Sequence, residues 1–341
     1  MSSYKELDGV NQSSLKKIIT HPQQYLSALK KYSEEEGFEK DHFVFGRAVD
    51  IMLVGNKEEF DDQFVRIPDT TKCSDTLKPI IDEIFLTASL LAEAEETTIS
   101  LLEYYKTHIL YKARAFNYYP NYKDDTVVAT VIKQGSEYFE LLKTTVGKTP
   151  ITETEYAKAV NCMMALKAND FTKKYTRKEK GIEFWDRFII QFEHKETKIK
   201  GELDRVVIDH NTKEITPIDF KTTSKSIYGF NSEFWKHRYD FQAATYYRGL
   251  MFHPAVKALI ENGYKLNSFK YVVVEKQLVH QPMVFNVGPD VLFIGLCGGE
   301  RPAYKIEGFY DAMNRYQWHK ENDKWDYPME YYEKGEINIK L

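Results

Sequence analysis

Cysteine is scarce in this sequence, and long hydrophobic runs are lacking. The three cysteines, Cys73, Cys162 and Cys297, form no CxxC pair, which excludes a zinc ribbon or a four-cysteine iron–sulfur site and argues against a disulfide framework. The longest apolar stretches, such as residues 291–297, are far shorter than the roughly 20 residues that a membrane span needs. The N-terminus, MSSYKELDGVNQSSLKK, has no apolar segment of a secretory signal. We therefore expect a cytoplasmic protein with no membrane partner.

The sequence also lacks a strong charge of either sign. Its 47 Lys and Arg residues stand against 51 Asp and Glu residues, a net charge of −4, so the molecule as a whole has no field to attract an anionic partner. A nucleic acid would have to bind locally. Residues 172–180 (TKKYTRKEK) have a net charge of +4, and residues 104–122 mix tyrosines with basic residues. Either segment could instead be a solvated helix face or the edge of a core.

The spacing of apolar residues predicts helices first and strands later. Residues 41–55 fit a helix that places Asp50 among apolar neighbours, and the dominant period from about residue 76 to 169 is helical. From Gly181 onward the pattern changes to three β-rich runs separated by polar turns, which indicates an antiparallel meander. A helix over about 234–251, two further strands and a helical stretch over about 290–322 are expected to follow.

The segment TPIDFKT carries the most chemical information. Strand alternation places Asp219 and Lys221 on one face, and a hairpin over 209–213 would bring Asp204 of the preceding strand opposite Asp219. Two carboxylates suit a hard cation such as Mg²⁺, which polarises a phosphodiester, while a lysine nearby can orient or deprotonate the attacking water. The alternative is a plain ion pair between Asp219 and Lys221.

Several motifs carry a resemblance to known nucleases. The strings KGELDR and IDFKTT, with 15 residues from Asp204 to Asp219, resemble the core of the PD-(D/E)XK nuclease superfamily, although Leu203 stands where the proline of that name would be. FQAATYY places Gln242 and Tyr246 one helical turn apart, as in the Q-x-x-x-Y motif of the RecB-like branch; ordinary helix packing is the alternative. In sequence order, motifs over about 11–285 resemble RecE-type phage and prophage exonucleases.

This resemblance implies a fold and a function. The fold is an α/β restriction-endonuclease-like core, a mixed sheet flanked by helices, with N-terminal core helices in 1–69, a helical insertion in 70–175, and the catalytic strands and C-terminal helices in 176–341. The function is an Mg²⁺-dependent exonuclease, with Mn²⁺ as a conceivable substitute, that resects double-stranded DNA ends from 5′ to 3′ for phage-type recombination in the host cytoplasm. A single-strand annealing partner and a homo-oligomeric ring are implied as well.

Other functions stay open on the same core. A single-strand exonuclease or a structure-specific endonuclease would use the same chemistry, and a non-catalytic DNA-binding or scaffold protein could retain the fold.

The resemblance also implies roles for individual residues. Asp204, Asp219, the carbonyl of Phe220 and Asp50 would bind the metal; many relatives carry a histidine at the position of Asp50, so that its carboxylate could either replace the imidazole or weaken the site. Lys221 would handle the attacking water. Gln242 and Tyr246 would support the position of the substrate and of the lysine.

Four more polar residues could assist. Glu183 could reach the metal through water or pair with the basic window at 172–180. Thr222 and Thr223 could hold a phosphate oxygen or cap the turn after their strand. Arg238 could contact phosphate or be an ordinary surface residue.

Two aromatic residues of the tyrosine-rich segment, Tyr118 and Tyr119, could stack on unpaired bases as a DNA end is melted. The helical middle of the chain would then form an arch over the strand.

Overall fold

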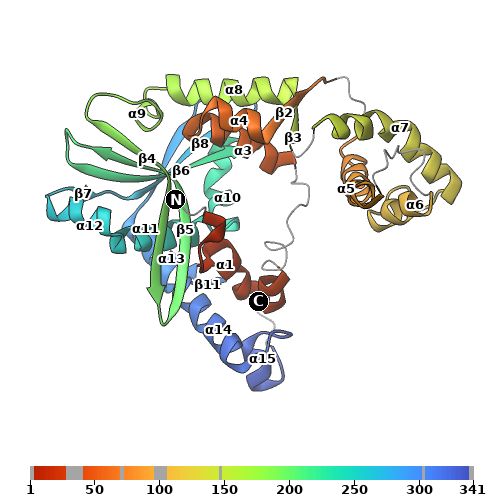
Figure 1. The fold of residues 1–341 in the computed structure, drawn as a ribbon. Helices are drawn as coiled ribbons and strands as arrows, with labels where there is room; N and C mark the ends of the chain where they lie inside the picture. The colour runs from red at the N-terminus through yellow and green to blue at the C-terminus, as the bar shows by residue number, and fades with distance from the viewer. Residues whose placement is uncertain are drawn as a thin grey trace. The chain divides into compact units, whose positions relative to one another are not determined.

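The computed structural model describes residues 4–27, 41–69, 73–95, 106–145, 148–301 and 304–337. The chain divides into two compact units, whose elements are labelled in Figure 1. Met1–Glu35 and Cys162–Leu341 form the first, here called the sheet unit, and Glu36–Asn161 form the second, here called the helical unit. Each unit is described by itself.

A seven-stranded mixed sheet is the centre of the sheet unit. Its strands are β1 (Val10–Asn11), β4 (Ile182–His194), β5 (Thr197–Asp209), β6 (Glu214–Thr223), β7 (Lys265–Leu266), β8 (Phe269–Glu275) and β9 (Met283–Val287). β4, β5 and β6 pair antiparallel in succession, β8 lies parallel to β6, and β9 returns antiparallel to β8. The meander and the α/β mixed sheet that the sequence predicts are therefore confirmed.

Helices flank this sheet and a small hairpin follows it. The elements are η1 (Tyr4–Glu6), α1 (Gln12–Thr20), α9 (Lys173–Thr176), η2 (Ile227–Gly229), α10 (Phe230–Lys236), α11 (Tyr239–Phe252), α12 (Pro254–Glu261), α13 (Pro289–Cys297), β10 (Gly299–Arg301), β11 (Tyr304–Ile306), α14 (Phe309–Asn322) and α15 (Met329–Lys334). The main core forms where α10, α11 and α13 pack on the sheet, and it includes Ile190, Phe230, Ala243, Tyr271 and Leu292. Burial of each large apolar side chain there contributes about 1.5–3 kcal/mol.

Two predicted helices are interrupted. The helix expected over 234–251 is split into α10 and α11, because Arg238 has a left-handed backbone with φ of 55°. The stretch expected over 290–322 contains the β10–β11 hairpin between α13 and α14. The region of N-terminal core helices expected in 1–69 includes residues 28–40, which lie outside the described residues.

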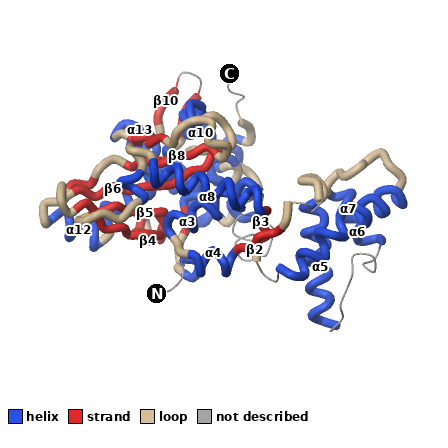
Figure 2. The backbone as a smooth tube through the Cα atoms, turned by 90° about the horizontal axis from the view of Figure 1, so that it is seen from above, coloured by secondary structure: helices blue, strands red, loops and turns tan. Residues whose placement is uncertain are grey.

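The helical unit consists of helices and two short strands among its described residues. They are α3 (Asp41–Val54), α4 (Lys57–Gln63), β2 (Phe64–Ile67), α5 (Lys78–Glu95), α6 (Lys106–Ala115), α7 (Asp124–Thr145), β3 (Thr149–Thr152) and α8 (Glu153–Ala168), the last of which continues into the sheet unit. α5, α6 and α7 pack side by side (Figure 2) around a core that includes Leu77, Ile84, Val127 and Phe139.

The boundaries of the compact units differ from those expected at 70 and 175. β2 pairs in parallel with β3, so that Phe64 lies opposite Thr149. This pair joins the segment before the expected insertion to the segment near its end. The helical unit consequently begins at Glu36 and ends at Asn161, within α8.

Candidate active site

The sheet opens between β5 and β6 at the predicted carboxylates. The ladder between these strands ends with Arg205 opposite Ile218, whereas β6 continues to pair with β8 as far as Thr223. Asp204 and Asp219 occupy the next register step. There the Phe220 N–H donates to Oδ2 of Asp204 at 2.7 Å, so a side chain takes the place of the neighbouring strand as the partner of that backbone group.

The backbone around Asp204 departs from a regular strand. The ladder of β4 and β5 includes the pairs Asp186–Arg205 and Phe188–Leu203 but not the pair between them, and Arg187, which stands at that register opposite Asp204, has a φ of 49°. Leu203 and Val206, three residues apart, both lie in the same core, although a regular strand would direct them to opposite faces. Such local irregularities re-aim side chains at functional sites.

Asp219 is the most enclosed carboxylate of this site. Its side chain is 2% exposed, and its Oδ2 lies 2.6 Å from Nζ of Lys221. The amide Nε2 of Gln242 donates to Oδ1 at 3.0 Å. Burial raises the pKa of Asp219, and the charge of Lys221 opposes that shift.

Lys221 is an ammonium in this arrangement. Burial alone would lower its pKa, but the carboxylates of Asp219 and Asp204 raise it above the ordinary value. The Nζ atom also lies over the rings of Tyr239 and Tyr271, 5.1 and 5.8 Å from their centroids. Lys221 can therefore donate hydrogen bonds and offset negative charge at neutral pH, whereas it cannot accept a proton.

Helix α11 supplies the residues that hold Asp219 in place. The Tyr271 hydroxyl shares its single proton between the Tyr239 carbonyl at 2.9 Å and, at the longer distance of 3.4 Å, Oε1 of Gln242. One turn further, Tyr246 hydrogen-bonds Gln242, and burial raises the pKa of its hydroxyl. A Cβ atom at Gly201 would lie 2.7 Å from the Tyr246 ring. The glycine of KGELDR thus makes room for the tyrosine of the helical motif.

Lys16 of α1 is a site residue that the sequence reasoning missed. Its Nζ donates to the His237 carbonyl at 2.8 Å. Burial, together with the positive charges of Lys221 and Arg238, lowers the pKa of Lys16 to about 8. Lys16 precedes Lys221 by some 200 positions in the sequence, and no local pattern distinguishes it from its neighbour Lys17.

Two predicted assisting residues have other partners. Glu183 lies opposite Ile208, four positions along β5 from Asp204, and it contacts His210 and Trp185 instead of the lysine-rich window. Thr223 caps the turn after β6, where its hydroxyl accepts from the Lys225 N–H at 3.1 Å. These residues are not brought to the carboxylates.

Arg238 is engaged within the protein. Its guanidinium binds the fully buried carboxylate of Asp240 and donates to the carbonyl of Glu307. Thr222 lies on β6 next to Lys221, opposite Val274 of β8, and is half-buried.

The remaining predicted residues belong to the helical unit. Asp50 lies half-buried on α3, whereas Asp204 and Asp219 belong to the sheet unit. Tyr118 is 8% exposed and part of the helical core, whereas Tyr119 is 40% exposed. Of the two tyrosines expected to stack on bases, only Tyr119 therefore presents its ring to solvent.

The donor set of the site suits a hard cation. Asp204 and Asp219 offer carboxylate oxygens and Phe220 a carbonyl, which are ligands that Mg²⁺ accepts together with water and substrate phosphate. A metal cation beside Asp219, in addition to the ammonium of Lys221, would favour the ionised form of this buried carboxyl. Within the described ranges, no three or more His, Cys, Asp or Glu side chains gather to hold a metal, so water and substrate would have to supply further ligands.

Comparison with known proteins finds a similarity to one nuclease superfamily. Residues 122–284 match the family model described as the PD-(D/E)XK nuclease superfamily, a range that contains Asp204, Asp219, Lys221 and Gln242. This part of the chain is therefore similar to the superfamily, whose members generally use divalent metal ions. This match supports nuclease activity and implies DNA as the substrate.

The other comparisons add less. A solved structure described as "Putative exonuclease" from Eubacterium rectale is 13% identical over 68% of this chain and 82% of that chain, with a TM-score of 0.34. This similarity is too low to support a conclusion about fold or function. No curated protein matches the sequence. Among the described residues, no helix is both long and apolar enough to cross a membrane.

Proposed function

We propose that this protein is an Mg²⁺-dependent DNA exonuclease that resects double-stranded ends from 5′ to 3′. The observation that carries the proposal is the opening between β5 and β6, where Asp204 and Asp219 face the same site and Lys221 lies 2.6 Å from Asp219. The superfamily match supports the chemistry. The polarity, the phage-type recombination role, the annealing partner and the homo-oligomer rest on the resemblance of the motifs to RecE-type exonucleases.

The residues of the sheet unit divide the work of phosphodiester hydrolysis. A divalent cation bound to Asp204, Asp219 and the Phe220 carbonyl would polarise the phosphodiester. Lys221, which stays protonated, donates to the attacking water or to a phosphate oxygen and offsets the charge that develops there. Gln242 fixes the orientation of Asp219, and Tyr246 supports Gln242. Asp50 stays a prediction from the sequence as a further ligand.

The proposal is tested by digestion of end-labelled linear duplex DNA. Purified wild-type protein is incubated with and without Mg²⁺ on substrates labelled at the 5′ or the 3′ end, beside a closed circular control. We expect loss of the 5′ label from linear DNA in the presence of metal. Asp219→Asn and Lys221→Met should each lower the rate by at least about 100-fold, because each removes charge stabilisation in the transition state.

Glu183→Gln is the matched control. It changes a carboxylate of the same sheet that lies away from the site, so we expect the wild-type rate. Cleavage of the circular substrate would point to an endonuclease, and preference for single strands to a single-strand exonuclease. Binding of duplex without any metal-dependent cleavage would contradict the proposal and favour a non-catalytic scaffold.

A further inference from the structure

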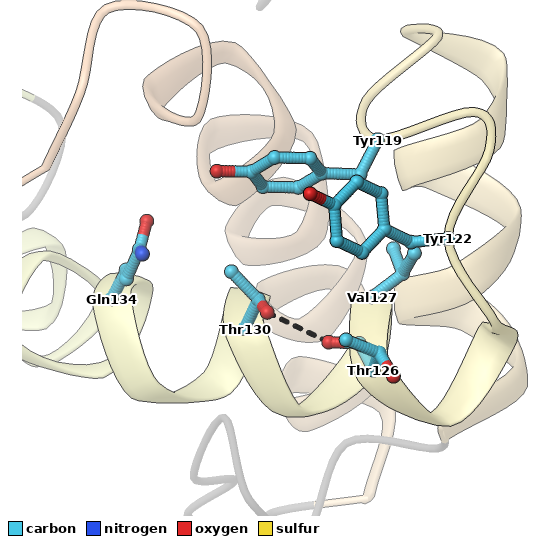
Figure 3. Close-up of a pocket in the computed structure, with 6 residues that line it drawn as sticks. All are labelled: Tyr119, Tyr122, Thr126, Val127, Thr130 and Gln134. Atoms are coloured by element: carbon cyan, nitrogen blue, oxygen red, sulfur yellow. Dashed lines mark hydrogen bonds between the residues drawn. The ribbon is translucent and has the colours of Figure 1, made fainter.

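The helical unit contains a pocket that the nuclease site does not use. It has a volume of about 190 Å³ and lies between the loop that precedes α7 and the first turns of that helix. The lining residues are Tyr119, Tyr122, Thr126, Val127, Thr130 and Gln134, and Figure 3 shows the two tyrosine rings above the helix that carries the other four.

The loop that carries the two tyrosines is held in one conformation by Arg114. This guanidinium donates to the carbonyls of Tyr119, Pro120 and Tyr122, at 2.7 to 3.1 Å, and binds the carboxylate of Asp124 at 2.7 Å. Tyr119 itself has a φ of 45°, a left-handed conformation that is costly for a residue with a bulky side chain. The rings are thus positioned before any ligand arrives, which lowers the entropic cost of binding.

The rings have faces left for a ligand. Tyr119 and Tyr122 are 40% and 56% exposed. Their centroids lie 4.9 Å apart at an interplanar angle of 61°, so the two rings meet edge to face and do not stack on one another. Exposed, pre-positioned aromatic rings of this kind are the usual platforms for unpaired bases, because every base has a π-face.

The opposite wall of the pocket offers both kinds of hydrogen-bonding group. The Thr130 hydroxyl donates its proton to the Thr126 carbonyl at 2.7 Å, which directs its lone pairs toward other donors. Oε1 of Gln134 accepts from the buried Tyr118 hydroxyl at 3.4 Å, and the amide group carries two N–H donors besides. A base edge, with donors and acceptors side by side, can use both groups.

The size and charge of the pocket narrow the class of ligand. Drug-sized ligands occupy pockets of about 300 Å³ or more, so 190 Å³ suits a single small ring system. None of the six lining residues is charged, which does not suit a phosphate inside the pocket. Lys123, beside Tyr122 in sequence, is exposed and can contact a backbone phosphate at the rim.

We propose that this pocket binds one unpaired nucleobase of single-stranded DNA. The choice of DNA rests on the proposed function; the choice of a base instead of a phosphate rests on the pocket. Tyr118, which the sequence suggested as a stacking residue, instead supports the wall through Gln134.

The test compares two oligonucleotides that differ only in their bases. Full-length protein in EDTA is titrated with fluorescein-labelled oligothymidine and with an abasic oligomer of the same length, and binding is followed by fluorescence anisotropy. We expect wild type to prefer oligothymidine. Tyr122→Ala should weaken that binding by about 5-fold to 100-fold, as loss of one base stack does, and should leave the abasic oligomer unaffected. Tyr122→Phe should retain the preference.

Tyr111→Ala is the matched control, because Tyr111 is 69% exposed on α6 and does not line the pocket. An equal loss in Tyr111→Ala, or equal wild-type affinity for both oligomers, would overturn the pocket proposal. Because the assay needs no cleavage, the two proposals can fail separately. Binding without a base preference, or no binding of oligothymidine, overturns the pocket proposal alone, whereas the proposed function fails only if duplex DNA is not cleaved in the digestion assay.

Discussion

Among single residues, Lys16 occupies a position that disfavours its own positive charge. It lies near two other cations. Burial and the charges of Lys221 and Arg238 lower its pKa to about 8. A fold selected for stability alone would not gather three cations in this way. Clustered positive charge beside two carboxylates is what a site for an anionic substrate requires.

We predict that Lys16→Met stabilises the protein at pH 7 while slowing DNA cleavage. In the unfolded chain the pKa of Lys16 is near 10.5, and in the folded chain it is about 8, so at pH 7 the charged lysine disfavours folding. Its removal should add about 1 kcal/mol after allowance for solvent screening.

The pH dependence provides the check. Between pH 8 and 10.5 the folded protein releases the Lys16 proton while the unfolded chain retains it, so the stability of wild type rises relative to the variant. Urea unfolding at pH 7 and pH 10 should therefore show the advantage of Lys16→Met shrinking. Lys17→Met, on the exposed side of the same helix, is the control; a pH-independent difference between wild type and Lys16→Met would refute this account.

Some residues of the site could be predicted from the sequence, whereas Lys16 could not. Asp219, Lys221, Gln242 and Tyr246 could be assigned together because their spacings, two along a strand and four along a helix, fix which side chains share a face. Lys16 could not be assigned, since its position depends on the tertiary approach of α1 to a helix turn more than 200 residues later. The contacts of Glu183 with His210 and of Arg238 with the Glu307 carbonyl likewise depend on the tertiary fold.

Among the elements, β1 passes into α1 at the polar residue Asn11. β1 pairs in parallel with β5, Val10 opposite Ile199, and Asn11 then begins α1, its Oδ1 accepting from the Ser14 N–H at 2.8 Å. Serine is a common N-cap residue, but Ser13 and Ser14 lie inside the helix. The cap lies earlier because the strand pairing fixes where the helix can start.

We predict that Asn11→Ala lowers the free energy of unfolding by about 1 kcal/mol, the usual cost of losing an N-cap. Guanidinium unfolding measures the difference. Ser13→Ala is the control, because the Ser13 hydroxyl is exposed and donates to Asn11 without capping the backbone. A larger loss in Ser13→Ala than in Asn11→Ala would show that the serine is the cap after all.

The other elements follow the same distinction between local and tertiary causes. Alternation predicted the strands of the meander well because each is long and half or fully buried. The break between α10 and α11 escaped prediction, since it depends on the contacts of Arg238 with Asp240 and the distant Glu307 carbonyl. The β10–β11 hairpin has strands of three residues, too short for a period to be recognised.

At the scale of the whole molecule, the chain runs from one unit into the other and back. The sequence suggested a helical insertion from its period, and the period was sound for α5, α6 and α7. It could not locate the ends of the unit, because these depend on the parallel pairing of β2 with β3 across some 80 residues, a non-local contact without a signature in either four-residue strand.

Among the described residues, all buried members of the core of α5, α6 and α7 lie between Cys73 and Leu142, within residues 73–145. We therefore predict that this fragment folds alone, with a helical circular dichroism spectrum and a cooperative thermal transition. A single core in a fragment of this length rarely supplies more than about 3–5 kcal/mol. Phe139, only 1% exposed, is central to it, and Phe139→Ala should cost about 3–5 kcal/mol and abolish the transition, whereas Tyr111→Ala at the surface should preserve it. A wild-type fragment without a cooperative transition would contradict the independence of this core.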